Sequence, residues 1–480
     1  MTEAEALERR KWIALILLAA AQFVVVLDAS IVNVALPSIG EDLDISNGEL
    51  SWVVNAYTLF FGGFLLLGGR MADLLGRRRV FMAGLILFAI ASLFGGLAQN
   101  EIQLIIARGV QGLGAALLSP AALSIVTTTF TEGAERNKAL GVWGAVAGSG
   151  GAAGVLLGGV LTDALSWEWV LFVNVPIGLA AAALAPVVLA DTRDTERRRH
   201  FDAAGALTIT LGLSILVYAL VDAEDAGWGS TQTVLLLTLS ALLHLAFLIV
   251  ESRTDAPLVP FKIFRLRTLS ASNVIGLLIG MALFSMFFFV SLYMQNVLGF
   301  DALKTGLAYL PLALTIIVSA GVASQLVTKL GFKPVLMFGL LLVAIGLVWF
   351  GQVSVGGSYV ADVLFPSIIA GAGLGFSFVP VTIGAVAGTT DEESGLASGL
   401  INTSQQIGGA LGLAVLSTIA FANVPDGGRP DPQALTNGFQ DAFFVGAAFA
   451  ALAFVIAAVA IRGADSEAMK GEAAAVPAAA

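Results

Sequence analysis

Apolar stretches long enough to cross a lipid bilayer recur along the whole chain, and this pattern constrains the fold more than any other feature. The sequence is 58% hydrophobic and only 12% charged, and a bilayer-spanning helix needs about 20 mostly apolar residues in a row. It therefore predicts an all-α integral membrane protein with fourteen transmembrane helices, near 12–36, 51–69, 80–98, 102–127, 139–161, 169–189, 203–222, 232–250, 269–294, 303–327, 335–351, 358–382, 395–421 and 439–461.

The basic residues of the loops divide sharply between the two sides. The loops after every second helix carry sixteen Lys and Arg, including Arg77, Arg78 and Arg136, whereas the opposite loops carry only Lys304 and Arg429. Cytoplasmic loops hold the excess of Lys and Arg in membrane proteins. We therefore expect a multi-pass protein of the cell (plasma) inner membrane with both termini in the cytoplasm, which also supports an even number of helices.

Several classes of protein are excluded by what the sequence lacks. It has no cysteine, two histidines and a net charge of −10, which argue against thiolate or His-rich metal sites and against nucleic acid as a partner. No lysine follows a glycine, and neither HExxH nor GxSxG occurs, so the chain offers no Walker A loop and no familiar hydrolase motif. We expect no enzymatic activity, no metal and no cofactor, with an ion gradient as the energy source.

A weak internal repeat relates the two ends of the chain. GLGAALLSP at 112–120 and GLGFSFVP at 373–380 each place a proline after Gly-Leu-Gly, and QLVTKLGFKP at 325–334 resembles RMADLLGRRR at 70–79. Chance repetition in a Gly-, Ala- and Leu-rich sequence is the alternative to two similar halves with a site between them. We expect an N-terminal six-helix half at 1–190, two additional helices at 191–268, a C-terminal six-helix half at 269–464 and a short disordered cytoplasmic tail at 465–480.

One carboxylate, Asp28, lies inside the first apolar run, FVVVLDASIVNVALP at 23–37. An acid in hydrocarbon costs roughly 2.5–3.5 kcal/mol on insertion scales. Asp28 is therefore a snorkelling interfacial residue, a structural partner of another buried polar group, or a proton site that loads and unloads during transport.

The depth of Asp28 matches that of a buried arginine. At about 1.5 Å per residue, Asp28 lies roughly 12 Å below the outer end of its helix, and Arg108 lies roughly 10 Å below the same surface. Burial favours a neutral acid, and a nearby cation favours a charged one. We expect Arg108 within reach of Asp28, directly or through water, to couple protons; a static buried pair is the alternative.

Two loops on the expected cytoplasmic side carry opposite charges. GRMADLLGRRR at 69–79 places an acid and a turn-forming glycine among arginines, and TTDEESG at 389–395 carries acids without a basic residue. We expect a gate in which these acids, or the start of the helix that follows them, meet the arginines when the inner side closes; positive-inside topology alone is the alternative. The gate residues are Asp73, Gly76, Arg77, Arg78, Glu392 and Glu393.

Polar and aromatic side chains at membrane depth are candidates for a substrate cavity. Phe and Met around 281–294 suit an adaptable apolar pocket, although some of them are expected to face lipid. Amides in NTSQQIGGALG at 402–412 either line the cavity or bond between helices. The candidates are Asn33, Asn55, Tyr57, Gln111, Phe284, Phe288, Tyr293, Asn402, Gln405 and Gln406.

The fifth predicted helix is unusually rich in glycine, with GAVAGSGGAAGVLLGG at 144–159. Glycines permit close helix packing and local bending. Close packing is the simpler interpretation, and Gly150, Gly154 and Gly158 are candidates for a hinge.

Five segments resemble signature segments of the major facilitator superfamily, in particular of the fourteen-helix drug:proton antiporter group, the Qac/Emr-type multidrug exporters. They are LDASIVNVALP, SWVVNAYTLFFGG, GRMADLLGRRR, ARGVQGLGAALLSP and WEWVLFVNVPIG. The resemblance covers nearly the whole chain. It implies the major facilitator fold, with Asp28 as a candidate for proton or cation coupling, Arg108 linked to proton transfer, and Asp73 and Arg77 controlling the conformational switch.

The chain departs from the family pattern at three places. Gly151 and Val155 stand where the fifth-helix antiporter motif has prolines, and Glu168 replaces a basic residue between two tryptophans. Thr328 stands where the second-half gate loop would carry its acid, so only the N-terminal loop keeps the full gate chemistry.

These patterns together favour a proton-coupled exporter of lipophilic or amphipathic drugs or natural products that works by alternating access. Its expected partners are the small-molecule substrate, protons and membrane lipid, and its expected state is a monomer. An exporter of lipids or lipid-linked molecules that uses the same cavity is one alternative. A non-transporting receptor or scaffold is another, and the buried acid with its matched arginine counts against it.

Overall fold

The computed structural model describes residues 3–45, 47–130, 133–190, 202–254, 257–390, 393–422, 431–463 and Ser466. Every regular element among these residues is a helix. The gate residue Glu392 and the expected tail at 465–480, apart from Ser466, lie outside the described residues.

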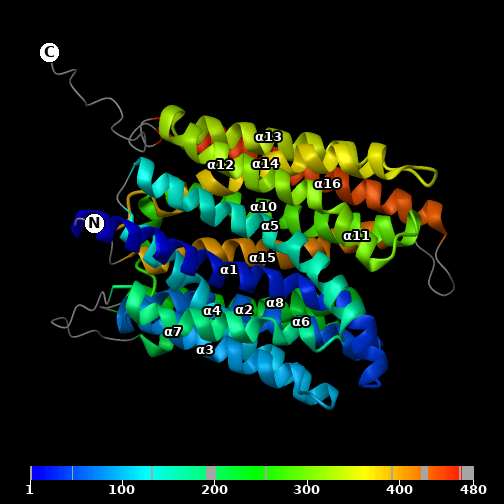
Figure 1. Ribbon diagram of the computed structural model, residues 1–480, viewed down its shortest axis with the longest axis horizontal. Coiled ribbons are helices and arrows are strands. Elements are labelled where there is room, and N and C mark those ends of the chain that lie inside the picture. Colours follow the sequence, from blue (N-terminus) through cyan, green and yellow to red (C-terminus); the bar gives the residue numbers. More distant parts are fainter. Residues whose placement is uncertain are drawn as a thin grey trace.

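The first helices form one bundle; α2, α3, α4 and α7 lie in the lower part of Figure 1, and α1 and α5 cross the middle of the view. Within it α3 and α2 pack on α4, and α1 packs on α5 and α7. The elements are α1 (Glu3–Asp42), α2 (Asn47–Leu75), α3 (Arg77–Gly96), α4 (Glu101–Thr129), α5 (Ala134–Ala164), α6 (Trp169–Phe172) and α7 (Asn174–Val188).

The last helices form a second bundle, most of which lies in the upper part of Figure 1, with α15 in the middle of the view. Here α13 and α12 pack on α14, and α10 packs on α15 and α16. The elements are α10 (Arg267–Leu292), η2 (Tyr293–Val297), α11 (Ala302–Ala308), α12 (Leu310–Leu330), α13 (Phe332–Phe350), η3 (Tyr359–Leu364), α14 (Phe365–Val386), α15 (Ser394–Phe421) and α16 (Pro432–Ala460).

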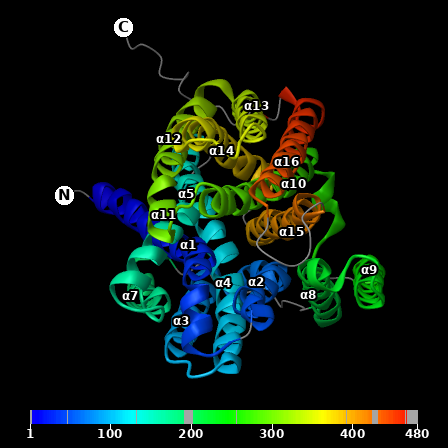
Figure 2. The same cartoon turned by 90° about the vertical axis from the view of Figure 1, so that its right-hand side faces the viewer.

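Two further helices, α8 (Ala203–Ala226) and α9 (Thr231–Arg253), lie beside the two bundles. Viewed end-on in Figure 2, α9 is outermost and α8 lies next to α2 and α15. A short 3₁₀ helix, η1 (Phe261–Arg265), then leads into the second bundle. The division of the chain into two six-helix halves and an added pair stays a prediction.

The number of membrane spans agrees with the predicted fourteen. Thirteen helical stretches among the described residues are long and apolar enough to cross a membrane. The fourteenth is α5, whose parts Ala134–Gly151 and Ala153–Ala164 meet at 44°. The chain is therefore an all-helical, multi-pass membrane protein.

Three spans contain a local irregularity, which the apolar pattern did not predict. Helix α6 ends at Phe172 and α11 ends at Ala308, each with one residue before the next helix, and the π-helical turn η3 ends at Leu364 and continues directly into α14. A proline follows each irregularity, namely Pro176, Pro311 and Pro366. Because proline lacks an N–H and its ring clashes with the carbonyl four residues earlier, it interrupts the helix on its N-terminal side.

Glycines bring neighbouring helices into contact. On α5, a Cβ added at Gly150 would lie 2.7 Å from Val26 Cγ1, one at Gly154 would overlap Ser30 Oγ, and one at Gly158 would lie 2.8 Å from the Ile31 carbonyl. The three glycines therefore lie on the face that packs against α1, as the packing interpretation expects. A hinge at these positions stays a prediction.

The replacement Gly154→Ala should destabilise the protein by about 1–3 kcal/mol, because the new methyl group must push α1 and α5 apart. Gly321→Ala in α12 is the matched control, since a Cβ there meets nothing within 4 Å, and it should be neutral or stabilising by up to about 1 kcal/mol. Thermal unfolding of the purified protein measures both. Equal stability of the two variants would contradict the close packing of α5 on α1.

Candidate functional site

The centre of the first bundle holds a fully buried ion pair. Asp28 in α1 is 0% exposed and Arg108 in α4 is 1% exposed, and Arg108 Nη1 donates to Asp28 Oδ2 at 2.6 Å. The expected proximity of these residues is therefore confirmed, and their contact is direct.

Two amides complete the surroundings of the carboxylate. Gln111 Nε2 donates to Asp28 Oδ1 at 2.8 Å, and Asn174 Nδ2 donates to the same oxygen at 2.7 Å. Both amides also donate to Ser92 Oγ, at 3.0 and 3.1 Å. Ser92 in turn donates to the Leu171 carbonyl at 2.9 Å. Each carboxylate oxygen thus accepts at least one hydrogen bond, as a buried charge requires.

The guanidinium of Arg108 is held from three further directions. Its Nε donates to the Val53 carbonyl at 3.0 Å, and its Nη1 also donates to Gln111 Oε1 at 2.6 Å. Its Cζ lies 4.4 Å from the centre of the Tyr57 ring, within the range of a cation–π contact. Tyr57 is itself fixed by a 3.2 Å hydrogen bond from its hydroxyl to the Val25 carbonyl. The pair is therefore rigidly oriented.

The sequence analysis missed two members of this network, Ser92 in α3 and Asn174 at the start of α7. Both are 0% exposed. Asn174 stands in the quoted segment WEWVLFVNVPIG as the one amide in an apolar run, which could have marked it. Ser92 carries no comparable signal, because serine is common in membrane helices.

All side chains of the network come from α1, α2, α3, α4 and α7 of the first bundle. The carboxylate therefore lies inside one half of the molecule rather than on a wall shared by the two halves. A proton can reach it only when these helices part or through a chain of water.

The candidate cavity residues occupy different environments. Tyr57 and Gln111 belong to the buried network around Asp28. Tyr293 is 1% exposed, and its hydroxyl donates to the Ser354 carbonyl at 2.7 Å, so in this conformation it is packed rather than facing an open space. The remaining candidates are exposed or half-buried, and their place in a cavity stays a prediction: Asn33, Asn55, Phe284, Phe288, Asn402, Gln405 and Gln406.

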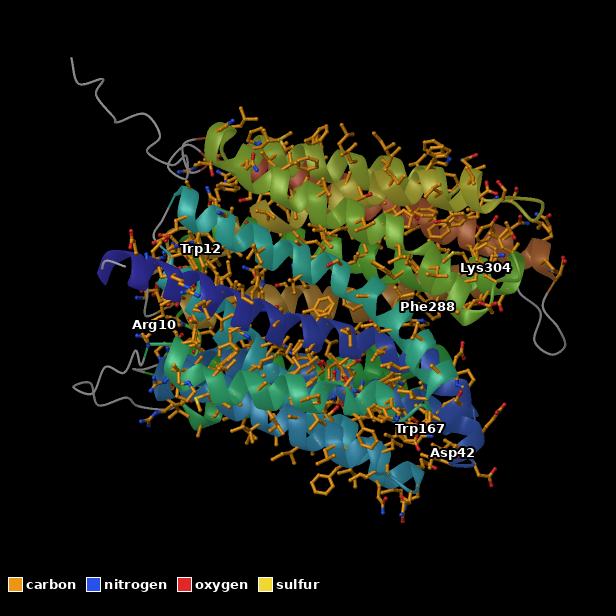
Figure 3. The ribbon with its side chains drawn as sticks, in the orientation of Figure 1. Arg10, Trp12, Asp42, Trp167, Phe288 and Lys304 are labelled. Atoms are coloured by element: carbon orange, nitrogen blue, oxygen red, sulfur yellow. The ribbon has the colours of Figure 1, made fainter. Side chains whose placement is uncertain are left out.

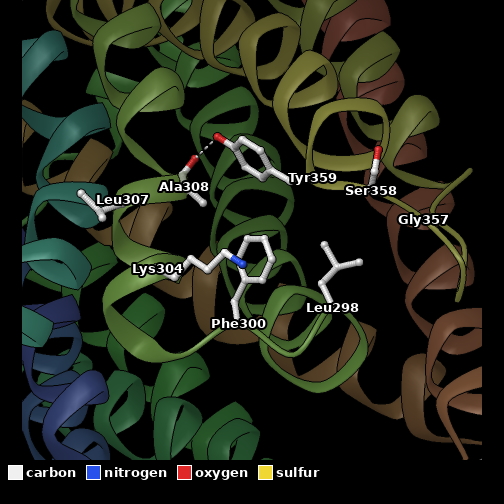
Figure 4. A pocket seen from close by; sticks show the side chains of 8 residues that line it. All are labelled: Leu298, Phe300, Lys304, Leu307, Ala308, Gly357, Ser358 and Tyr359. Carbon is white, nitrogen blue, oxygen red and sulfur yellow. Dashed lines mark hydrogen bonds between the residues drawn. The ribbon is translucent and has the colours of Figure 1, made fainter.

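A pocket of about 540 Å³ opens elsewhere, between α11 and η3. Figure 4 shows Lys304 and Phe300 within it, with Lys304 Nζ 3.8 Å from the centre of the Phe300 ring. Figure 3 places Lys304 at the end of the molecule that also holds Asp42 and Trp167, opposite Arg10 and Trp12. None of the predicted cavity residues lines this pocket, so it is not the predicted substrate site.

The gate loop lies at the end of α2 and contacts the other half through Asp73. Asp73 accepts hydrogen bonds from the backbone amides of Gly395 at 3.1 Å and Leu396 at 3.0 Å. These amides lie in the first turn of α15, where the helix leaves its N–H groups unpaired and carries partial positive charge. The carboxylate from one half therefore caps a helix of the other half.

The other described gate residues make separate contacts, and the expected pairing of arginines with the acids at 391–392 involves residues outside the described ones. Gly76 adopts φ 99° between α2 and α3, a conformation that favours glycine. Arg77 lies 3.7 Å from Asp73, and Arg78 donates to the Leu189 carbonyl at 3.1 Å. Glu393 pairs with Lys262 at 3.3 Å. The start of α15 does meet the gate loop, and Asp73 is the residue that it meets.

Further contacts join the two halves at this end of the molecule. The hydroxyls of Ser124 and Ser394 lie 2.8 Å apart. Asn137 Nδ2 donates to Thr328 Oγ1 at 3.1 Å, and Ser324 Oγ donates to the Asn137 carbonyl at 2.7 Å. The Asp73 end is therefore closed in this conformation.

The segment between α9 and α10 reinforces the closure. Glu251 at the end of α9 accepts hydrogen bonds from the amides of Leu258 and Val259, at 3.2 and 3.1 Å. The side chains of Leu258 and Val259 are buried in a cluster that includes Leu66 of α2 and Leu396 of α15. Through Glu251, the added helix pair thus holds the segment with Leu258 and Val259, which contacts both halves.

Comparison with known proteins agrees with this architecture. The family model described as Major Facilitator Superfamily matches residues 18–413. The chain is 40% identical to the puromycin resistance protein pur8 of Streptomyces alboniger, covering 94% of this chain and 90% of that protein. It is 41% identical to the cephamycin export protein CmcT of Amycolatopsis lactamdurans, covering 92% and 91%. The crystal structure of the human organic anion transporter MFSD10 matches with a TM-score of 0.66 at 15% identity, covering 95% of this chain and all of that one, which supports the fold.

The replacement Asp73→Asn should weaken the closed end by about 1 kcal/mol, because the amide carries no charge to match the helix terminus. The chain has no cysteine, so a single Ser124→Cys change supplies a reporter at the closed contact. Its reaction with a water-soluble maleimide should rise severalfold in Asp73→Asn. Asp301→Asn is the control, because Asp301 caps α11 away from this contact. Equal labelling in both backgrounds would show that Asp73 does not hold the end closed.

Proposed function

This chain belongs to the major facilitator superfamily, and we propose that it is a proton-coupled exporter of lipophilic or amphipathic drugs or natural products. The relatives that support this proposal are named for puromycin resistance and cephamycin export, and each aligns with more than nine-tenths of this chain. Their alignment spans both bundles and the added helices, so the proposal concerns the whole molecule.

The observation that carries proton coupling is the fully buried Asp28–Arg108 pair. A buried ion pair is a weak source of stability, because desolvation offsets much of the attraction. Ionisable residues inside membrane proteins commonly serve ion or proton pathways. We assign Asp28 as the proton site and Arg108 as the cation that favours its ionised form.

The proposed cycle is alternating access between two halves, at 1–190 and 269–464, with 191–268 as an added pair. The bias of basic loops makes the Asp73 end cytoplasmic, and that end is closed here. With that end closed, a proton from the outer side would reach Asp28 through a chain of water or as the helices around it part. Opening of the Asp73 end then admits substrate from the cytoplasm or inner leaflet, and substrate entry favours loss of the proton.

Coupling in this proposal is indirect. The substrate path lies between the halves, where Phe284, Phe288 and Gln405 are the candidate contacts, whereas Asp28 lies within the first bundle. Movement of α1 and α4 would link the two, because α4 contacts α15 as well as α1.

The test is transport by purified protein in proteoliposomes under an imposed pH gradient, with a fluorescent lipophilic cation as the probe. Wild type should move the probe against its gradient, and Asp28→Asn should abolish that movement while it retains binding. Asp441→Asn is the control, because Asp441 in α16 is an exposed acid that should leave transport unchanged.

The other outcomes discriminate between the alternatives. Equal transport by wild type and Asp28→Asn would remove Asp28 from the coupling mechanism. No movement of a panel of such cations by wild type, together with movement of a fluorescent lipid, would favour lipid export instead.

A further inference from the structure

Asn174 contacts the proposed proton site with one end of its amide and leaves the other end unused. Its Nδ2 donates to Asp28 Oδ1 at 2.7 Å and to Ser92 Oγ at 3.1 Å. Its Oδ1 is buried and has no hydrogen-bond partner among the described residues. Buried amide oxygens are normally paired, so this one calls for an explanation.

The two protonation states of Asp28 need different partners. A carboxylate only accepts hydrogen bonds, and the donors from Arg108, Gln111 and Asn174 suit it. A protonated carboxyl must also donate one hydrogen bond. A buried O–H without an acceptor is unfavourable, so the neutral state needs an acceptor within reach.

Only one of the three donating side chains has an acceptor to spare. The guanidinium of Arg108 has no acceptor at all. Gln111 Oε1 already accepts from Arg108 at 2.6 Å, and turning its amide would place N–H groups against a cation. Asn174 Oδ1 has no such bond to lose.

We propose that Asn174 is a positioning residue that serves both states of Asp28 by rotation of its amide. In the ionised state Nδ2–H donates to the carboxylate, as observed. When a proton forms an O–H bond on Asp28 Oδ1, the amide turns so that Asn174 Oδ1 accepts from that O–H. The hydroxyl of Ser92 can turn from the Leu171 carbonyl to the same oxygen, while it still accepts from Gln111. The step adds one proton to Asp28 and otherwise changes only hydrogen bonds.

The charged and titratable groups described around Asp28 do not offer another acceptor for its protonated carboxyl. Arg108 from α4 and Tyr57 from α2 face the site, and the Tyr57 hydroxyl is already committed to the Val25 carbonyl. The α5 face packed on α1 presents Gly150, Gly154 and Gly158. From α3 and α7 the groups that touch the network are Ser92 and Asn174, and neither is ionisable.

Infrared difference spectroscopy of the purified protein tests the proposal, which rests on Asp28 being the proton site. The carboxyl C=O band of Asp28 is identified by its loss in Asp28→Asn and followed against pH. Asn174→Leu should raise the midpoint pH of this band by about one unit, because the ionised form loses a donor. The band should also move to higher wavenumber, because the carboxyl O–H loses its acceptor.

The control is Asn273→Leu in α10. Asn273 is 8% exposed, and both ends of its amide are paired, with the Leu269 carbonyl at 2.9 Å and with Ser404 Oγ at 3.0 Å. This variant loses a buried amide in the other half and should leave the band and its midpoint as in wild type. If Asn174 served only as a donor to the carboxylate, Asn174→Leu would raise the midpoint but leave the wavenumber of the protonated band unchanged, and that result would overturn the proposal.

A measurement on wild type covers the case in which Asn174→Leu does not fold. In protein labelled with ¹⁵N-asparagine, the side-chain amide signal of Asn174, assigned by its absence in Asn174→Ser, should shift with pH in step with the Asp28 band. A signal that ignores pH while Asp28 titrates would overturn the role of Asn174 alone. An Asp28 that never protonates across the stable pH range would instead overturn the proposed proton site.

Discussion

The structure depends on how a single negative charge is accommodated inside a bundle of apolar helices. Asp28 accepts hydrogen bonds from three side chains on α4 and α7, and removal of one partner from a buried pair typically destabilises a protein by about 3–5 kcal/mol. Rearrangements of the first bundle that leave this charge unpaired are therefore costly. The proposed proton coupling uses this cost, because a proton on Asp28 would remove it.

Polar and apolar contacts together hold the halves at the Asp73 end. The contact of Asp73 with the first turn of α15 joins a carboxylate to backbone amides, and hydroxyl and amide groups meet near Ser124 and Asn137. Apolar packing accompanies them in the cluster that includes Leu66, Leu258 and Leu396. The charge network around Asp28 lies within one half, and separate contacts join the two halves. This division suits a protein whose halves move as units.

The sequence was enough to predict features that depend on the length of a helix or on the depth of a residue in the membrane. Spans of membrane length, and the matched depths of Asp28 and Arg108, are fixed by helix rise and bilayer thickness. Asn174 and Ser92 could not be assigned in the same way, because their role depends on where α3 and α7 pack. The start of α15 was expected to meet the gate loop, but its contact with Asp73 was not, because a hydrogen bond to a backbone amide leaves no signature in residue type. The helix breaks before Pro176 and Pro311 were readable in principle, but the continuous apolar runs concealed them.

The cap that Asp73 provides has a consequence for α15 itself. The amides in the first turn of this helix donate to the two carboxylate oxygens of Asp73, which belongs to a different half of the molecule. Separation of the halves at this end would leave the Gly395 and Leu396 amides to water or to the residues just before them. The polar groups at the start of α15 are therefore satisfied in part by the opposite half, so the cap of this helix is also a contact between the halves.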